Sequence, residues 1–302
     1  MTLGMIGLGR MGAKMTERLL KSGHDVVVYD RNPEAIQRVV ERNAIGARSL
    51  SHLVERLSVP RVIWLMVPAG EPVDQMIHLL LSHLQKDDIL IDGGNSYYKD
   101  SIRRAARLKE HQIAFVDVGT SGGIWGLEEG YSLMIGGDGA AVQHLTPIFQ
   151  ALAPAHDRGW GHVGPHGAGH FAKMIHNGIE YGLMQAYAEG FAILKHKTEF
   201  DFDLHHIAEI WRAGSVVRSW LLDLTSAALH ADSGLTDIAP YVEDSGEGRW
   251  TVAEAIDLNT PSPVITLALL QRLRSRDAES FSDRLLAAMR HQFGGHAITQ
   301  AR

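Results

Sequence analysis

Cysteine is absent from the 302 residues, so the chain forms no disulfide, uses no thiolate in catalysis and binds no cysteine-ligated zinc. This absence fits a reducing compartment, and we expect a cytoplasmic protein. No apolar run approaches the roughly 18 to 20 residues that a helix needs to cross a bilayer. The N-terminal stretch carries neither a basic region nor a signal-type cleavage site, so it is predicted to begin folded structure.

Basic residues are outnumbered by acidic ones, 29 Lys and Arg against 35 Asp and Glu, which gives a formal net charge of −6, and they form no basic run. This balance argues against a nucleic-acid partner, and nothing in the composition indicates a membrane partner. An anionic substrate would have to be held by a local cluster of positive groups, against the overall sign of the charge. With 45% hydrophobic and 21% charged residues, the chain can build a sizeable core.

Short apolar segments alternate with helical patterns through about the first 160 residues. Segments such as 25–30 and 87–94 are rich in β-branched and aliphatic residues. Such alternation predicts parallel strands joined by crossover helices. The Gly- and His-rich stretch 156–170 is interpreted as a junction, and only helical patterns follow it. We therefore predict an α/β fold, with an N-terminal Rossmann-type doubly wound sheet over 1–165 and an all-helical C-terminal domain over 166–302.

The sequence GLGRMG, at 7–12, has the G-x-G-x-x-G spacing of a dinucleotide-binding turn, and it follows a predicted strand and opens a helix. Gly7 permits a tight turn, Gly9 lets the backbone approach a pyrophosphate, and Gly12 lets the helix pack on the strand. The helix N-terminus offers free N–H groups to the anion. The alternative is a glycine turn that serves packing only. The predicted cofactor contacts in the turn are Gly7, Leu8, Gly9, Arg10, Met11 and Gly12.

Asp30 ends the second predicted strand, 18 residues after Gly12, where a carboxylate can accept hydrogen bonds from an adenosine ribose. It favours NAD, because a 2′-phosphate would meet a negative charge. Arg31 argues partly for NADP, because a guanidinium can pair with that phosphate or stack on adenine. We predict NAD as the preferred cofactor, with NADP as a possible second. Further predicted contacts after the strands are Asp30, Arg31, Asn32, Val67, Pro68, Ala69 and Asn95.

The segment KMIHNGIEYG, at 173–182, places Lys173, His176, Asn177 and Glu180 at helical offsets that share one face. Seven residues cover about 10.5 Å of helix axis, comparable to a small sugar acid. The alternative is a solvated face with a Lys/Glu pair, but the mostly apolar flanks indicate an enclosed helix, where such residues seldom lie without a task or a partner. An enclosed lysine can serve as a base and an enclosed glutamate as an acid, because desolvation disfavours their charged forms. Two such groups suggest two proton transfers at different atoms.

Several segments resemble the decarboxylating 6-phosphogluconate dehydrogenases, specifically their short form, over nearly the whole chain. They are GLGRMG, IDGGNS, VGTSGGIWGLEEGYSLMIGG, HFAKMIHNGIEYGLMQAYAEGF and RHQFGGHA, in the family's order. The wider β-hydroxyacid dehydrogenases share the glycine turn, the Ser-Gly-Gly loop and the lysine with a following asparagine. They lack the HNGIEY continuation, so Glu180 distinguishes among these relatives.

The resemblance implies oxidative decarboxylation of 6-phosphogluconate to ribulose 5-phosphate and CO2, as in the pentose phosphate pathway, without a metal. Lys173 would be the general base at the 3-hydroxyl and would then polarise the ketone. Glu180 would protonate the carbon that loses CO2. Ser121, Gly122 and Gly123 would hold the carboxylate end and Tyr181 the phosphate. The implied catalytic residues are Lys173, Glu180, Asn177 and His176, and the implied substrate contacts are Asn95, Ser121, Gly122, Gly123, His176, Asn177, Tyr181, Arg290 and His296.

The C-terminal segment RHQFGGHA resembles a family segment that supplies Arg290 and His296 to the partner subunit's active site. The resemblance therefore implies a homodimer or a dimer of dimers, with the C-terminal domain binding substrate and dimerising. The alternative is a helix end capped by Gly294 and Gly295. The long form's basic, glycine-rich phosphate segment is shorter here, at 244–251. The phosphate-binding side chain therefore stays open among Arg249, Arg274, Arg276 and Arg290.

Two other functions stay open. One is another β-hydroxyacid dehydrogenase, for example one acting on 3-hydroxyisobutyrate, which would transfer hydride without releasing CO2. The other is a non-catalytic dinucleotide-binding regulator, whose behaviour would not depend on Lys173. His162, His166 and His170 are spaced by four, but glycines and Pro165 interrupt the helical pattern there, and we predict no metal site.

Overall fold

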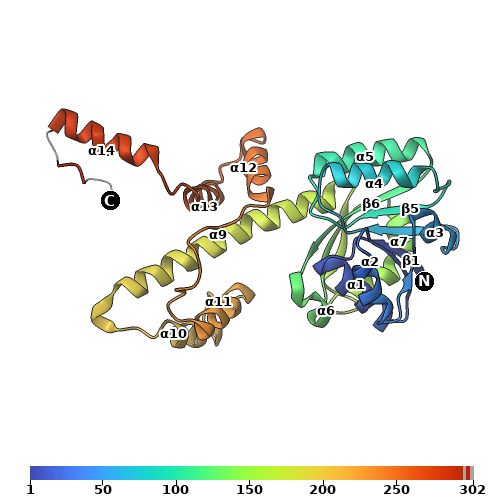
Figure 1. The fold of residues 1–302 in the computed structure, drawn as a ribbon, viewed down its shortest axis with the longest axis horizontal. Coiled ribbons are helices and arrows are strands. Elements are labelled where there is room, and N and C mark those ends of the chain that lie inside the picture. The colour runs from blue at the N-terminus through green and yellow to red at the C-terminus, as the bar shows by residue number, and fades with distance from the viewer. Residues whose placement is uncertain (295–296, 300–302) are drawn as a thin grey trace. The chain divides into compact units, whose positions relative to one another are not determined.

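The computed structural model of the protein describes residues 1–294 and 297–299 (Figure 1). The chain divides into two compact units, Met1–Asn177 and Gly178–Arg302. The division falls inside the long helix α9 (Ala168–His196), which is continuous through it.

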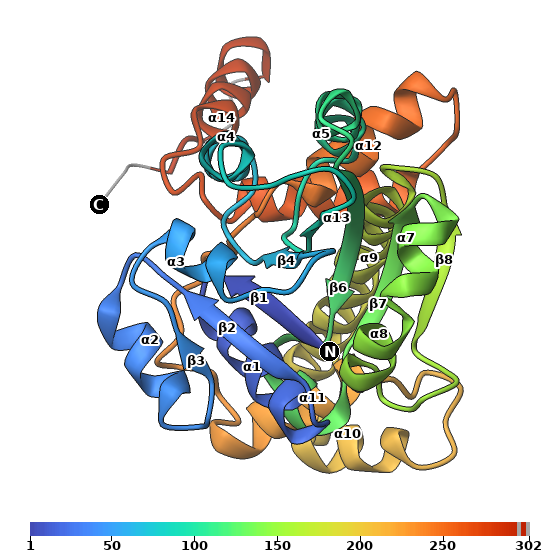
Figure 2. The ribbon, with the colours of Figure 1, turned by 90° about the vertical axis from the view of Figure 1, so that its right-hand side faces the viewer.

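The first unit contains one eight-stranded sheet in the order β3-β2-β1-β4-β5-β6-β7-β8 (Figure 2). Neighbouring strands from β3 to β6 pair in parallel, which confirms the predicted Rossmann-type sheet. The strands are β1 (Thr2–Ile6), β2 (Asp25–Tyr29), β3 (Ile45–Gly46), β4 (Val62–Leu65), β5 (Ile89–Asp92), β6 (Ala114–Ser121), β7 (Ser132–Gly137) and β8 (Trp160–Gly164).

The last two strands depart from the parallel arrangement expected from the alternating pattern. β7 pairs antiparallel with β6, and β8 pairs parallel with β7. Only η1 (Gly123–Trp125) and the short α6 (Gly126–Glu129) connect β6 to β7. This connection is too short for the crossover of a dozen or more residues that a parallel neighbour requires. β8 lies within the stretch interpreted as a junction, where frequent glycines obscure the strand pattern.

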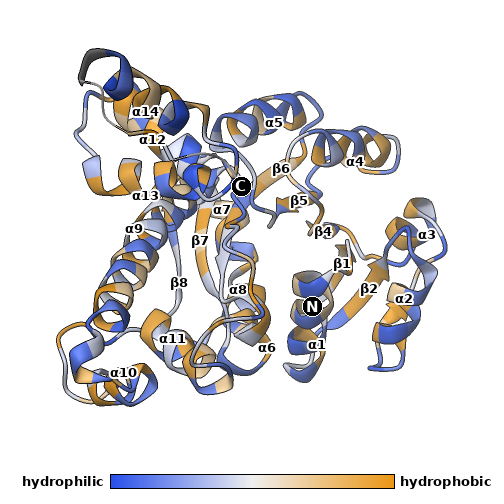
Figure 3. Cartoon of the chain, turned by 60° about the vertical axis from the view of Figure 1, so that its left-hand side comes forward, coloured by the Kyte–Doolittle hydropathy of each residue, from blue (hydrophilic) through white to orange (hydrophobic). Residues whose placement is uncertain are grey.

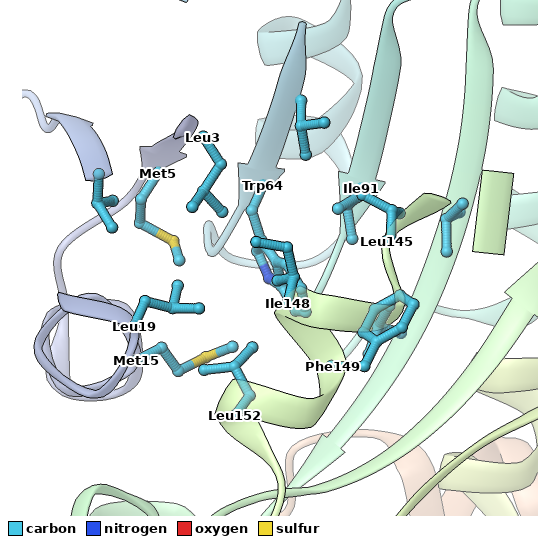
Figure 4. Packing of buried hydrophobic residues seen from close by; sticks show 14 of the residues in the cluster. Leu3, Met5, Met15, Leu19, Trp64, Ile91, Leu145, Ile148, Phe149 and Leu152 are labelled. Atoms are coloured by element: carbon cyan, nitrogen blue, oxygen red, sulfur yellow. The ribbon is translucent and has the colours of Figure 1, made fainter. Parts of the chain in front are cut away.

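Helices cover both faces of the sheet. α1 (Arg10–Lys21), α2 (Pro33–Val40), α7 (Gly139–His144) and α8 (Thr146–Leu152) share one buried cluster with the strands, and part of this packing is drawn in Figure 4. α3 (Leu50–Glu55), α4 (Glu71–Leu81) and α5 (Tyr98–Glu110) share the other. Alternate strand residues therefore face opposite clusters, Trp64 toward the first and Ile63 and Leu65 toward the second. The strands are therefore hydrophobic on both faces, and the orange colour along β2 and β7 in Figure 3 marks their apolar composition.

The second unit is helical throughout its described residues, which confirms the expected helical C-terminal domain. One buried cluster joins the C-terminal half of α9 to α10 and α11, through side chains that include Phe191 and Leu222. Another joins Tyr181 of α9 to Leu269 of α13, with Val252 of α12 packed against it. The elements after α9 are η2 (Thr198–Phe200), α10 (Leu204–Arg212), α11 (Trp220–Ala231), α12 (Glu247–Asp257), α13 (Pro263–Arg274) and α14 (Phe281–Gly294).

The first turn of α9 lies directly on the backbone of β6 and β7. A Cβ on Gly169 would lie 2.5 Å from the carbonyl oxygens of Asp117 and Met134. A Cβ on Gly119 would lie 2.3 Å from the Cβ of Lys173. Both distances are far below van der Waals contact, so only glycine allows this approach of helix to strand.

We therefore expect Gly169→Ala to lower the free energy of unfolding of the first unit by about 2 to 3 kcal/mol, the range of an overpacked core. Gly161→Ala in β8 is the control, because a Cβ there would meet no atom within 4 Å. Its effect should stay within about 0.5 kcal/mol. Urea unfolding followed by circular dichroism measures both variants, and equal stability of the two would contradict the close approach.

Candidate active site

The turn between β1 and α1 has the shape that a pyrophosphate requires. Gly7 has φ = 96°, and a Cβ there would lie 2.3 Å from the carbonyl oxygen of Met66. A Cβ on Gly12 would lie 2.0 Å from the carbonyl oxygen of Gly7. A Cβ on Gly9, by contrast, would meet no atom within 4 Å, so its missing side chain leaves open space beside the N-terminus of α1. Because the first turn of α1 has no acidic residue, this space suits an anion.

Asp30 follows β2 and faces the same turn. One carboxylate oxygen accepts a hydrogen bond from the backbone N–H of Leu8 at 2.6 Å, and the other accepts one from Asn32 at 2.8 Å. Asn32 in turn caps α2, because its side-chain oxygen accepts from the N–H of Glu34 at 3.0 Å. Asp30 is therefore fixed as an acceptor beside the glycine turn, and the neighbouring Arg31 is exposed.

The loops after β4 and β5 lie next to this turn. Backbone hydrogen bonds join the strand ends, from Met66 to Ile6 at 2.7 Å and from Gly93 to Leu65 at 3.0 Å. Parallel strands bring their carboxyl ends to one edge, and the strand order reverses between β1 and β4, where such folds bind ligands. The predicted contacts on these two loops are Val67, Pro68, Ala69 and Asn95.

The loop after β6 leaves the sheet at the same edge. Ser121 ends the strand, and Gly122 and Gly123 follow with φ of 134° and 52°, values that favour glycine. Lys14 of α1 donates from Nζ to the carbonyl oxygen of Ile124 at 2.5 Å. This hydrogen bond ties the Ser-Gly-Gly loop to the helix that opens the dinucleotide turn.

A buried aspartate, which the sequence analysis did not single out, anchors the start of α9. Asp117 in β6 is fully buried and accepts hydrogen bonds from the N–H groups of Gly167 at 2.7 Å and His170 at 2.9 Å. Its carboxylate satisfies N–H groups that a helix start leaves without partners, and it opposes the positive end of the helix dipole. The His170 ring bonds Ser101 of α5 through Nδ1 at 2.6 Å. Sequence patterns could not reveal Asp117, because its partners lie 50 and 53 residues away.

Lys173, His176 and Asn177 form a hydrogen-bonded chain one turn further along α9. Nζ of Lys173 donates to Oδ1 of Asn177, and Nδ1 of His176 lies 3.0 Å from the same oxygen. An amide oxygen only accepts, so Nδ1 carries the proton, and Nε2 of a neutral ring can accept from Ser121 Oγ, 3.4 Å away. Lys173 and Asn177 are only 7% and 8% exposed. The structure thus brings the predicted lysine, histidine, asparagine and Ser-Gly-Gly loop together.

Glu180 and Tyr181 follow in the same helix, in the part that belongs to the second unit. Glu180 comes seven residues after Lys173, so the helical period places both on one side of α9. Tyr181 is buried, and the guanidinium carbon of Arg272 lies 3.5 Å from its ring centroid. The Tyr181 hydroxyl has no hydrogen-bond partner within residues 1–294 and 297–299.

The arginines considered for phosphate binding are mostly engaged with carboxylates. Arg249 donates to Asp244 at 2.5 Å, Arg276 lies 3.9 Å from the same carboxylate, and Arg274 pairs with Asp283. Burial alone would raise the pKa of Asp244, but Arg249 and a backbone N–H outweigh it and lower that pKa. Asp244 therefore stays ionised and neutralises the arginines beside it.

Arg272 is the arginine that sequence reasoning missed. It donates to the carbonyl oxygen of Glu243 at 2.9 Å and to the Met184 sulfur at 3.5 Å, and it has no carboxylate partner in the described part of the chain. Its stacking on Tyr181 joins positions far apart in the sequence, so no local pattern indicates it. Arg290 lies exposed in α14, and His296 lies outside the described residues.

The described ranges 1–294 and 297–299 contain neither a membrane-spanning helix nor a three-residue metal-binding group. In those residues no helix is both long and apolar enough to span a membrane. In the same ranges no group of three His, Asp or Glu side chains is arranged to hold a metal ion.

Comparison with protein families matches both halves of the chain. The model of the NAD binding domain of 6-phosphogluconate dehydrogenase matches residues 2–162, and that of the 6-phosphogluconate dehydrogenase C-terminal domain matches 169–292. The NAD(+)-dependent decarboxylating 6-phosphogluconate dehydrogenase of Haloferax volcanii is 45% identical over 99% of both chains. A putative 6-phosphogluconate dehydrogenase of Bacillus subtilis is 43% identical over 98% of this chain and 99% of that protein.

Longer relatives contain further sequence. The decarboxylating 6-phosphogluconate dehydrogenase of Treponema pallidum is 39% identical, and the match covers 92% of this chain but 60% of that protein. The solved Plasmodium falciparum 6-phosphogluconate dehydrogenase is 31% identical with a TM-score of 0.84, covering 100% of this chain and 66% of that one. A 3-hydroxyisobutyrate dehydrogenase from Salmonella typhimurium shares the fold alone, at 22% identity, a TM-score of 0.75 and coverage of 92% of this chain and 95% of that one. Matched in both halves and over its full length, the chain belongs to the 6-phosphogluconate dehydrogenase family.

Proposed function

We propose that the chain catalyses the oxidative decarboxylation of 6-phosphogluconate to ribulose 5-phosphate and CO2, with NAD as the oxidant. One observation carries this proposal: a buried lysine, bonded to Asn177, lies at the sheet edge where the dinucleotide turn opens. NAD bound at that turn supplies the hydride acceptor for oxidation at C3 of the substrate. The open space beside Gly9 and the fixed acceptor Asp30 fit its pyrophosphate and its adenosine ribose.

Lys173 acts as the general base that removes the proton of the 3-hydroxyl during oxidation. Asn177 holds the lysine by accepting a hydrogen bond from Nζ. The Cβ of Lys173 packs against Gly119, which fixes the start of the lysine side chain beside β6. Oxidation leaves a 3-keto acid and a protonated Lys173. The ammonium group then donates to the ketone oxygen, which accepts the electrons released when CO2 leaves.

Glu180 donates a proton to the carbon that has lost CO2, which completes the conversion to ribulose 5-phosphate. Its place seven residues after Lys173, on one side of a continuous helix, suits two proton transfers at different atoms of one sugar acid. The Ser-Gly-Gly loop holds the carboxylate end, and Asn95, His176 and Asn177 bind the hydroxyls. The hydrogen bond between Ser121 and His176 couples these two groups of contacts.

Arg272 and Tyr181 form the phosphate contact within the helical unit. Two features support this over the other arginines: Arg272 faces no carboxylate in the described part of the chain, and the buried Tyr181 hydroxyl lacks a partner there. Arg249 and Arg276 instead share Asp244. The phosphate would supply both the acceptor and the negative charge that this pair lacks.

The chain works as a homodimer, to which α14 contributes from each copy. Every residue from 281 to 292 is exposed in the single chain, although Phe281, Leu285, Leu286 and Met289 are large and apolar. They fall along one stripe of the helix, and such an unburied stripe is typical of an interaction surface. Arg290 follows it directly, and we assign it to the substrate phosphate in the partner's site. His296 is assigned to the same site from the family resemblance alone.

The reaction itself is tested by mixing the protein with NAD and 6-phosphogluconate and following NADH and CO2 together. We expect equal amounts of both products. Lys173→Met should lower kcat by about a thousandfold and Glu180→Gln by about a hundredfold, the range of lost acid–base catalysis. Glu189→Gln, at an exposed position of the same helix, is the matched control and should stay within about twofold. If NADH forms without release of CO2, or if Glu180→Gln leaves kcat unchanged, the result would instead favour a non-decarboxylating β-hydroxyacid dehydrogenase.

Cofactor choice is tested at Asp30. Asp30→Asn removes the charge that repels a 2′-phosphate and weakens the acceptor for the ribose. We expect kcat/KM to fall about tenfold or more with NAD and to rise with NADP, since a hydrogen bond to a charged group contributes about 1.5 to 3 kcal/mol. Asp25→Asn, at the exposed start of the same strand, should leave the NAD/NADP ratio unchanged. A ratio that does not move in Asp30→Asn would rule out this residue as the selector.

The dimer is tested by light scattering after gel filtration, where we expect twice the 33.2 kDa chain mass. Leu285→Glu places a charge in the apolar stripe and should yield monomers with little activity, because burying an unpaired charge is costly. Ala287→Glu, on the opposite side of α14, should leave the dimer intact. A monomeric native protein, or a dimer that tolerates Leu285→Glu, would show that α14 is not the contact.

A further inference from the structure

Arg104 of α5 is among the largest fully buried side chains of the protein, with 1% of its surface exposed. Arginine is seldom buried to this extent, because removing its charge from water is costly unless carboxylates and hydrogen bonds compensate. A buried arginine at the ligand-binding edge of a sheet therefore requires an explanation that packing alone does not offer.

All five N–H donors of Arg104 have acceptors. Nε and Nη2 grip the two oxygens of Asp74 as a fork, at 3.0 and 3.1 Å. Nη2 also donates to the carbonyl oxygen of Gly70 at 2.9 Å. Nη1 donates to Asp92 Oδ2 and Ser96 Oγ, both at 3.3 Å. Because a guanidinium has five N–H groups in fixed directions, the site leaves none of them unsatisfied.

The charges around Arg104 balance without a bound ligand. Asp92 is fully buried, and Asp74 is partly exposed and also accepts from Arg103 on the outside at 3.0 Å. Burial alone would raise the pKa of Asp74, but hydrogen bonds from Arg104 and Arg103 lower it to about 2. Asp74 therefore stays ionised at neutral pH, and it anchors the guanidinium by its two oxygens.

These anchors belong to the two loops assigned to cofactor and substrate. Gly70 and Asp74 open α4, directly after the loop 67–69. Asp92 and Ser96 flank the loop that carries Asn95, and Ser96 donates to Asp92 at 2.7 Å. Gly94 also donates its N–H to Asp92 at 3.1 Å. The exposed Asn95 thus sits between residues that are tied down on both sides.

We infer that Arg104 is a positioning residue, which fixes Asn95 relative to the loop 67–69 and so sets the affinity for both NAD and substrate. This inference rests on the proposed function, in which both loops bind ligands. Arg104 contacts neither ligand. Its five hydrogen bonds go to the loops after β4 and β5 and none goes to α9, so Lys173 keeps its own partner, Asn177, without them. Loss of the five-donor arrangement should therefore act on binding and leave the proton transfers almost unchanged.

The test variant is Arg104→Lys, which keeps the charge but offers three donors from one nitrogen in place of five in a planar fork. We expect KM for NAD and for 6-phosphogluconate to rise about tenfold, with kcat within about twofold. The reason is that the lost contacts stabilise the bound ground state and the transition state equally. Arg103→Lys is the matched control, since this neighbour also binds Asp74 but from the exposed surface. It should leave both constants unchanged.

A double-mutant cycle separates positioning from general destabilisation. If Arg104 acts through Asn95, then Arg104→Lys should raise KM far less in an Asn95→Ala background than in the native protein. Equal effects in both backgrounds, or unchanged KM values in Arg104→Lys, would overturn the inference. If Arg104→Lys does not fold, Asp74→Asn serves as the second variant, because it weakens the paired hydrogen bonds between Arg104 and the partly exposed Asp74. Unchanged KM values in Asp74→Asn would also overturn the inference.

Direct binding distinguishes this inference from the proposed function. NADH affinity, measured by fluorescence without substrate, should weaken about tenfold in Arg104→Lys and stay unchanged in Arg103→Lys. A native protein that binds NADH but does not oxidise 6-phosphogluconate would refute the proposed substrate, while the NADH measurement would still decide the role of Arg104. Unchanged NADH affinity in a folded Arg104→Lys would refute the positioning role even where the native protein is active.

Discussion

The first turn of α9 rests on the bare backbone of β6 and β7, and the placement of Lys173, the proposed general base, depends on this contact. Three glycines remove the side chains that would hold helix and strands apart, at positions 119, 136 and 169. Asp117 then accepts the N–H groups of the helix start from within the sheet. A buried carboxylate is costly without partners, so its hydrogen bonds favour one position of the helix. The side chain of Lys173 consequently begins beside Gly119, two residues before the Ser-Gly-Gly loop.

The sheet edge around this lysine is held by polar side chains that connect neighbouring loops. Asp30 links the glycine turn to the end of β2, Lys14 links α1 to the loop after β6, and Arg104 links the loops after β4 and β5. Each bond joins segments distant in sequence, and together they fix the loops that we propose to bind ligands. Pre-organisation of this kind lowers the entropy that binding must overcome, because the loops are already ordered.

The amino-acid sequence predicts the local features of this arrangement well. GLGRMG, Asp30 and the spacing from Lys173 to Glu180 follow rules that operate within 20 residues, namely turn geometry, strand ends and helical period. The supporting residues escape such rules. Asp117, Arg104 and Arg272 each contact partners that only the fold brings near. In the sequence alone, no local pattern distinguishes them from other charged residues. β8 was missed for a related reason, because its pairing with β7 rather than its own glycine-rich composition makes it a strand.

The arginines near the C-terminus show why composition alone could not select the phosphate ligand. Arg249, Arg274 and Arg276 are all basic and close in sequence, but Asp244 and Asp283 engage them. An arginine paired with an ionised carboxylate must give up that partner before it can bind a phosphate, so its net gain is small. Arg272 stacks on an aromatic ring instead, which orients the guanidinium without neutralising its charge. In the described part of this unit, a positive charge that no carboxylate neutralises, rather than the number of basic residues, supports Arg272 as the proposed phosphate contact.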